Sequence, residues 1–274
     1  MKKYIDMTKK QIDEMDKSDV VLVSVVSPIE AHGSHLPVNT DVAIASEVMR
    51  RTMDALPGIK FIELPVLHIG AQPLPVTGSV GVRYGVLKNL LIDYGKGLYK
   101  SGFRKWVVFD NHGGPSHMLA EADASRILKR QGFELIVPFI DIMHGMNAHD
   151  PDIGLPADRD GSIMDSHAGT NETSLYMAFN EGFNDNKFGK FAPKKSFTGS
   201  LIRLLGADSI GAALDWLNEK EHPSYVGDPS KADADAGNKM LDYHVRKYID
   251  AIKGNYRHET GFNWFVKFLL RVIG

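Results

Sequence analysis

The chain has 274 residues, of which 43% are hydrophobic, and a formal net charge of −2. It can bury the core of one large α/β domain, and it has no basic surface typical of binding to nucleic acid or to anionic membranes. The absence of cysteine excludes disulfides, thiolate metal sites and a cysteine nucleophile. No stretch reads as a signal peptide or approaches the roughly 18 apolar residues of a membrane span, so we expect a cytoplasmic protein whose partners are small molecules.

Strands and helices alternate along most of the chain. Short apolar or β-branched runs predict buried strands at 20–26, 59–65, 106–109 and 133–139. Helical spacing of apolar residues predicts helices at 41–56, 84–100, 115–131, from an Asn171 cap to about 179, and at 231–253. This order predicts an α/β fold with a mostly parallel sheet and helices on both faces, in a single domain spanning 1–274.

Two segments interrupt this alternation. The polar stretch at 144–161 is either a lid over a site, with His144, His149, Asp158 or Arg159 touching substrate, or a solvated surface loop. The apolar segment at 261–274 predicts an added helix, for which docking or an oligomer contact is favoured over a membrane-surface anchor because it has only two cations.

Glu30 and His32 directly follow the first buried strand and are two residues apart, so both side chains lie on one side of an extended segment. The carboxyl ends of parallel strands are where open α/β sheets bind ligands. Asp41 begins the next helix, where its simplest role is helix capping. Beside Glu30 and His32, however, it also reads as a metal ligand.

His112 follows another strand and is succeeded by Gly113 and Gly114, which let backbone N–H groups approach a ligand closely. A third cluster places His167 in a loop before Glu172, in the first turn of a helix. Each cluster alone has an ordinary structural explanation. Together they offer only nitrogen and oxygen donors, a set that suits Zn²⁺, Mn²⁺ or Fe²⁺, with Asp41 able to bridge two ions.

The sequence resembles the creatininase-like amidohydrolase family. Four blocks in the family's order carry the resemblance: Ile29 to Pro37 with Thr40-Asp41, Asn111 to Gly114, His167 to Gly169 with Glu172 to Ser174, and Gly227 to Pro229 with Ala232 and Gly237. The resemblance implies a three-layer α/β/α fold, one or two divalent ions, hydrolysis of a C–N bond in a cyclic or formyl amide, and a homo-oligomer, often a hexamer.

Carried over by position, the resemblance implies site residues as well. The expected metal ligands are Glu30, His32, Asp41, His112 and Glu172. His167 matches the acid/base histidine, with Glu172 as a second catalytic group, and His35 is expected to support the loop. We expect Ser79, Gly113 and Gly114 to contact substrate.

Two features differ from creatininase itself. Gly113 and Gly114 stand where creatininase has an aromatic residue and a ligand glutamate, so creatinine is not the expected substrate and Glu172 is expected to supply the missing carboxylate. Residues 72–79 also differ from the Phe-Pro-Gly-Thr type of sequence expected there, which indicates different substrate recognition.

The predicted mechanism is attack by a metal-activated water on a carbonyl, after which His167 protonates the leaving nitrogen. Hydrolysis of a C–C bond in a cyclic diketone, or of a peptide bond, would use the same site. A non-catalytic, metal-stabilised binding protein is an alternative of another class. A phosphate-binding protein is disfavoured, because the chain lacks a P-loop pattern. His68, His117, His222, His244 and His258 are interpreted as ordinary surface or core histidines.

Overall fold

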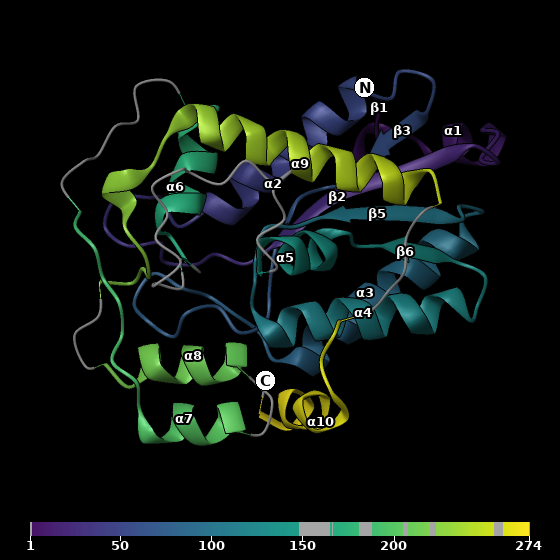
Figure 1. The fold of residues 1–274 in the computed structure, drawn as a ribbon. Coiled ribbons are helices and arrows are strands. Elements are labelled where there is room, and N and C mark those ends of the chain that lie inside the picture. The colour runs from purple at the N-terminus through teal and green to yellow at the C-terminus, as the bar shows by residue number, and fades with distance from the viewer. Residues whose placement is uncertain are drawn as a thin grey trace.

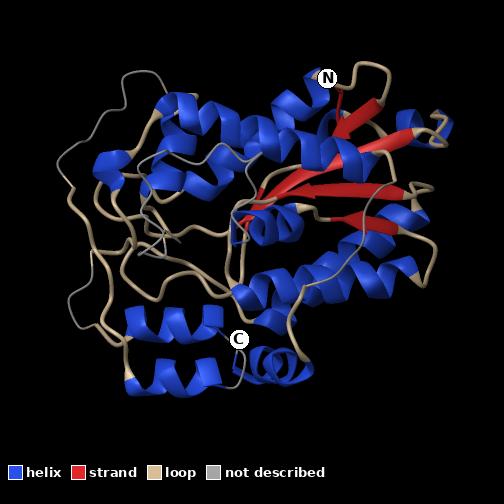
Figure 2. Ribbon diagram, viewed as in Figure 1, coloured by secondary structure: helices blue, strands red, loops and turns tan. Residues whose placement is uncertain are grey.

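A parallel sheet forms the centre of the molecule (Figure 2). The computed structural model describes residues 2–147, 165, 167–180, 188–204, 208–219, 223–254 and 260–273. The strands are β1 (Lys2–Lys3), β2 (Val20–Ser27), β3 (Lys60–Glu63), β4 (Leu67–His68), β5 (Lys105–Phe109) and β6 (Glu134–Ile136). Their order is β1-β3-β2-β5-β6, β4 continues beside the end of β2, and every pairing between these strands is parallel.

Helices connect the strands. The α-helices are α1 (Lys9–Glu14), α2 (Thr40–Asp54), α3 (Tyr84–Lys100), α4 (Pro115–Lys129), α5 (Phe139–Asn147), α6 (Thr170–Met177), α7 (Phe197–Leu204), α8 (Asp208–Leu217), α9 (Ala234–Ile252) and α10 (Trp264–Ile273). Two short 3-10 helices, η1 (Tyr4–Asp6) and η3 (Pro229–Lys231), complete the described elements. None of the helices in the described ranges is both long and apolar enough to cross a membrane.

The pleat of the central strands divides the core between two helical layers. In β2, Leu22 and Val26 face the core shared with α3, α4 and α10, whereas Val23 and Val25 face the core shared with α2, α5 and α9. Figure 1 shows the two helical layers on opposite faces of the sheet. The predicted three-layer fold with a mostly parallel sheet is confirmed.

Local patterns placed most elements correctly. The helix predicted at 84–100 has the bounds of α3, and the run at 20–26 is β2, all of whose residues are buried. The helix predicted at 231–253 starts later, as α9. It begins at Ala234 because the side chain of Asp233 accepts the Ala236 N–H at 2.7 Å and caps it.

The strand predicted at 133–139 is wrong at its end. β6 stops at Ile136, and Phe139 begins α5. Pro138 has no N–H to continue a strand ladder, while its carbonyl accepts the N–H groups of Asp141 and Ile142, which starts a helical turn.

The predicted Asn171 cap is also wrong. Helix α6 begins at Thr170 with Gly169 as its N-cap, so Asn171 lies inside the helix. The capping contact comes from upstream instead, because the carboxylate of Asp165 accepts the Asn171 N–H at 3.2 Å.

The structure describes only the start of the polar stretch at 144–161. The stretch at 144–161 begins inside α5, which contains His144. The prediction of a lid or a surface loop otherwise concerns His149, Asp158 and Arg159, which lie outside the described residues.

The added C-terminal helix is α10. Val266 and Leu270 are buried in the core shared with α3 and α4, and Arg271 pairs with Asp123 of α4 at 2.8 Å. One face of the helix thus docks on the domain. Trp264, Phe268 and Val272 are spaced by four residues and remain exposed.

Candidate metal centre

Six ionisable side chains meet beyond the carboxyl ends of β2 and β5. We call them the six-residue cluster: Glu30, His32, Asp41, His112, His167 and Glu172. Three overlapping triads drawn from them have potential ligand atoms within 4.8 Å of one another. All six were singled out from the sequence, and the structure brings them together.

Glu30 and His32 are held by the segment that follows β2. The Glu30 N–H donates to the Val38 carbonyl at 3.0 Å, and the Ala31 N–H donates to Ser79 Oγ at 3.0 Å. Gly33 then turns the chain with a φ of 66°, a conformation that glycine adopts at little cost. These contacts aim Glu30 and His32 into the cluster.

Asp41 lies between two histidines. It occupies the first turn of α2 and is 1% exposed. Its Oδ1 lies 3.4 Å from His32 Nε2, and its Oδ2 lies 3.6 Å from His112 Nδ1. This position between two nitrogen donors is what a bridging carboxylate requires.

His112 and Glu172 complete the two sides of the cluster. His112 Nδ1 lies 2.8 Å from Glu30 Oε2. Glu172 Oε2 lies 3.5 Å from His32 Nε2 and 4.0 Å from His167 Nδ1, and it accepts the Ala168 N–H at 2.6 Å. The Glu172 carboxylate therefore lies beside His32 and Asp41. Its replacement of the ligand glutamate of creatininase stays a prediction.

Main-chain carbonyls set the tautomers of three histidines. His32 Nδ1 donates to the Glu30 carbonyl at 3.0 Å, His112 Nε2 to the Ala71 carbonyl at 3.1 Å, and His167 Nε2 to the Ala31 carbonyl at 2.8 Å. When the ring is neutral, the opposite nitrogen then carries a lone pair that faces the cluster. This is the usual arrangement of metal-binding histidines.

Burial and mutual proximity perturb the protonation of the cluster. Burial would lower the pKa of His32, but the neighbouring carboxylates, Asp41 first among them, outweigh it and raise this pKa to about 10. Burial lowers the pKa of His167 to about 4 and raises the pKa of Glu172 to about 8. At neutral pH and without metal, His32 is protonated while its neighbour His167 is neutral.

Several potential metal-ligand atoms of the cluster are buried without an ordinary hydrogen-bond partner among the described residues. Glu30 Oε2, His32 Nε2 and Asp41 Oδ2 are buried, and their polar neighbours are other ionisable groups of the cluster itself. Burying such polar atoms is costly unless something satisfies them. Nitrogen and carboxylate donors at these separations fit one or two divalent cations, so the residues present suit the metal that the sequence predicts.

The other predicted site residues lie around the cluster. Ser79 supports the Ala31 backbone, as described above. His35 Nε2 lies 3.0 Å from the Ala168 carbonyl and 3.1 Å from Thr173 Oγ1, so it ties the first loop to the start of α6. Gly114 packs against the His112 ring, and Gly113 faces Met143. Substrate contacts of Ser79, Gly113 and Gly114 stay a prediction.

Two supporting residues, Asn111 and Asp110, were given no role in the sequence analysis. Asn111 Nδ2 lies 3.4 Å from oxygens of both Asp41 and Glu172. Asp110 accepts the His112 N–H at 3.0 Å and also binds the Ser27 hydroxyl. Both follow β5 directly, so their position at the strand end was the available signal. The main chain of Ala71 and Leu74 carried no such signal.

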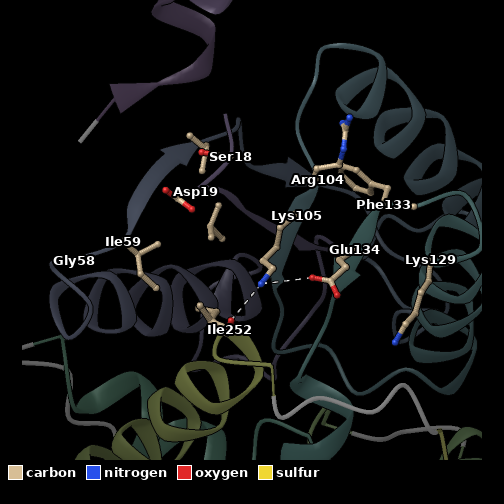
Figure 3. A pocket seen from close by; sticks show the side chains of 13 residues that line it. Ser18, Asp19, Gly58, Ile59, Arg104, Lys105, Lys129, Phe133, Glu134 and Ile252 are labelled. Atoms are coloured by element: carbon tan, nitrogen blue, oxygen red, sulfur yellow. Dashed lines mark hydrogen bonds and ion pairs between the residues drawn. The ribbon is translucent and has the colours of Figure 1, made fainter. Parts of the chain in front are cut away.

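A cavity of about 720 Å³ opens at the opposite edge of the sheet (Figure 3). It lies at the amino ends of β2, β5 and β6. Lys105, on its wall, is engaged with the Ile252 carbonyl at 3.4 Å and with Glu134 at 3.5 Å. Its lining contains no histidine, and its only carboxylates are Asp19 and Glu134. The described groups of three side chains that could hold a metal ion lie elsewhere, in the six-residue cluster and at Asp110, His117 and Glu121.

Comparison with known proteins decides the family. The sequence model of the creatininase family, described as creatinine amidohydrolase, matches residues 5–252. The chain belongs to the creatininase family. Creatininase-family members are metal-dependent amidohydrolases, and this chain is an enzyme of that class. Helix α10 lies beyond the residues that the family model covers.

Relatives in this family differ in their described roles. The mycofactocin precursor peptide peptidase of Mycolicibacterium smegmatis is 29% identical over 258 residues, covering 90% of this chain and 88% of that protein. A protein from Bacteroides fragilis NCTC 9343, described as a candidate creatinine amidohydrolase, is 20% identical with a TM-score of 0.67, covering 96% of this chain and 98% of its own.

Creatininase structures share the fold. A structure described as creatininase with Mn is 18% identical with a TM-score of 0.62, and a mutant creatininase of Zn–Zn type is 20% identical with a TM-score of 0.64. They cover 92% of this chain and 97% and 96% of their own chains.

Proposed function

We propose that the protein hydrolyses a C–N amide bond at a divalent metal centre formed by Glu30, His32, Asp41, His112 and Glu172. The observation that carries the proposal is the orientation of the histidines: one nitrogen of each ring binds a main-chain carbonyl, and the other faces the cluster. The creatininase structures with Mn and with Zn–Zn support a metal of this kind.

The donors divide into two overlapping groups. Glu30, Asp41 and His112 would hold one ion, and His32, Asp41 and Glu172 a second, with Asp41 shared between them. A divalent ion held there supplies a Lewis acid, which polarises a carbonyl oxygen and lowers the pKa of water to about 7.

His167 supplies the proton transfer. Its Nε2 is engaged with the Ala31 carbonyl, so Nδ1 is the atom that can accept a proton from the attacking water. Because burial keeps the pKa of His167 near 4, the ring is neutral and ready to act as a base at neutral pH. Once protonated, the same Nδ1 can deliver its proton to the leaving nitrogen. The ring is packed against His32 and Trp216, at centroid distances of 4.3 and 5.2 Å, which limits its motion.

The substrate is an amide other than creatinine. Gly113 and Gly114 provide neither the aromatic face nor the carboxylate found at these positions in creatininase, and this favours a differently shaped cyclic amide or a formamide. A peptide bond is the second candidate, and it is supported by the similarity to the mycofactocin precursor peptide peptidase over nearly the whole of both chains.

A substrate panel separates these candidates. Protein stripped of metal is reloaded with Mn²⁺, Zn²⁺ or Fe²⁺ alone and incubated with cyclic amides, lactams, formamides, cyclic diketones and short peptides, and the products are identified by mass spectrometry. We expect metal-dependent cleavage of an amide bond and none of creatinine. Cleavage of only a cyclic diketone would replace the C–N assignment, and metal-independent turnover would contradict the proposed centre.

A further inference from the structure

His112 is supported by a layer of contacts behind the six-residue cluster, which begins at the Ala71 main chain. The Ala71 carbonyl accepts the His112 Nε2–H at 3.1 Å, and the Ala71 N–H donates to Nδ1 of His117 at 3.3 Å. Ala71 is fully buried. The backbone of one alanine thus connects a proposed metal ligand with a second histidine, on α4, that the mechanism does not use.

The surrounding sequence makes room for this arrangement. A side chain at Gly70 would come within 2.8 Å of His117 Nδ1, and a side chain at Gly114 would overlap His112 Nε2 and lie 2.9 Å from the Ala71 carbonyl. Both positions therefore need glycine for the two histidines to reach Ala71.

Residues 70–74 are held over the cluster at further points. The Gln72 side chain accepts the Ser116 N–H at 2.8 Å, and the Gln72 backbone has a positive φ of 61°. The Leu74 N–H donates to Glu30 Oε1 at 2.5 Å. This short segment therefore contacts two of the proposed ligands, Glu30 and His112, through its main chain.

His117 also meets two buried carboxyl groups. Its Nε2 lies 3.2 Å from Glu121 Oε1 and 3.5 Å from Asp110 Oδ2, and these three side chains could by distance alone hold a cation. The ring orientation favours a different role. His117 Nδ1 faces an N–H donor, whereas the noncoordinating nitrogens of His32 and His112 face carbonyls. Nδ1 of His117 must therefore be the acceptor, and the proton of the neutral ring lies on Nε2, facing the carboxyl groups.

We propose that His117 is a positioning residue for the metal centre, because its Nδ1 fixes the Ala71 main chain whose carbonyl orients His112. This inference rests on the proposed metal-dependent function. Contacts behind a metal-binding histidine set its ring orientation and basicity, and losing them typically weakens metal affinity by about 10–100-fold.

The test compares His117→Asn with His117→Leu. The two side chains have similar size and shape, but only asparagine keeps an oxygen near the place of Nδ1 that can accept the Ala71 N–H. Affinity for Zn²⁺ and Mn²⁺ is measured by competition with a chromogenic chelator, and the unfolding temperature is measured on the metal-free proteins. We expect affinity to fall about 10–100-fold in His117→Leu and to be largely retained in His117→Asn.

A matched pair at His244 controls for the loss of a buried histidine. This residue on α9 is 2% exposed, and it is outside the six-residue cluster. We expect His244→Asn and His244→Leu to show no affinity gap between them. His117→Gln, which moves the amide away from the Nδ1 place, should behave like His117→Leu and serves if the leucine variant does not fold.

Three results would overturn the proposal. The first is equal affinity in His117→Asn and His117→Leu, and the second is a gap that only follows their unfolding temperatures. The third is the loss of one metal equivalent in Glu121→Gln, which would show that Asp110, His117 and Glu121 hold a cation themselves. If the wild-type protein binds no divalent ion, the proposed function fails as well. If the wild-type protein binds metal but His117→Asn and His117→Leu bind it with equal affinity, the positioning role fails and the proposed function stands.

Discussion

The centroids of the His32 and His167 imidazole rings lie 4.3 Å apart, with an interplanar angle of 32°, although the two residues come from distant parts of the chain. Their protonation is opposite. The carboxylates around His32 outweigh its burial and raise its pKa to about 10, whereas burial lowers the pKa of His167 to about 4. His32 therefore carries a proton that a metal ion must displace, whereas His167 is a neutral base.

Metal binding should release a proton. A ligand histidine must be deprotonated, and the pKa of His32 in the metal-free protein is raised, so the proton competes with the metal at neutral pH. We expect affinity to rise with pH between pH 6 and 9, by about tenfold per pH unit for each proton displaced. Chelator competition at several pH values measures this. Affinity that does not vary over the range would contradict the protonated state of His32.

Removal of a central donor should empty the site. His32→Ala and Asp41→Ala each take away a donor of two of the overlapping triads. We expect purified variants to retain no metal by elemental analysis and to show no turnover. His68→Ala, which removes an exposed histidine of β4, is the control and should keep both properties. Near-normal turnover in either cluster variant would disprove the ligand assignment.

His167→Ala should separate catalysis from metal binding. With the ligands intact, we expect normal metal content and a kcat lower by about 10²–10⁴-fold, the usual contribution of a positioned acid or base. Metal content and kcat are measured on the same preparation. Loss of the metal would instead show that His167 is itself a ligand, a role its place in one triad with Glu30 and His32 permits.

Gly114→Ala should disturb His112 by contact alone. The added methyl group would overlap His112 Nε2 and press on the Ala71 carbonyl, so it should displace the ring and weaken metal binding. Gly97→Ala is the matched control, since a side chain there meets no atom within 4 Å and a glycine in a helix is less favourable than alanine. Chelator competition and thermal unfolding of both variants test this. Unchanged affinity in Gly114→Ala would show that the His112 ring tolerates the shift.

His244 should make the fold sensitive to acid. Burial alone lowers its pKa to about 3, so the folded state holds it neutral while the unfolded chain protonates it. Above pH 6.5 the ring is neutral in both states, and the full free energy of unfolding is present. As pH falls from 6.5 toward 3, protonation of the unfolded chain lowers this free energy by about 1.4 kcal/mol per pH unit. Urea unfolding of wild type and His244→Leu at a series of pH values gives the difference. The same slope in both proteins would rule out this contribution.

The sequence was most informative where one local pattern determines both structure and position. The buried run of β2 and the helical spacing of Leu87, Leu91 and Leu98 in α3 identified a strand and a helix from neighbouring residues alone. Because Glu30 and His112 each follow such a strand, their approach at one sheet edge could be expected before any coordinates were known.

Contacts made by the main chain could not be predicted in the same way. Ala71 meets His112 and His117 through its own N–H and carbonyl, and nothing in an alanine side chain marks that role. The start of α6 was misplaced for a related reason. Asn171 has the right residue type for a cap, but its N–H is bound by the side chain of Asp165, six residues earlier, and residue type alone does not reveal such a contact.

The six-residue cluster contains nitrogen and oxygen donors only, and the whole chain has no cysteine. Thiol reductants such as dithiothreitol therefore have no cysteine to protect in this protein, while their soft sulfur atoms compete for zinc. Buffers without thiols are the better choice for purification and storage. Activity lost on exposure to air would indicate oxidation of a bound ion such as Fe²⁺ or of a methionine such as Met143, and a thiol alone would not repair the methionine.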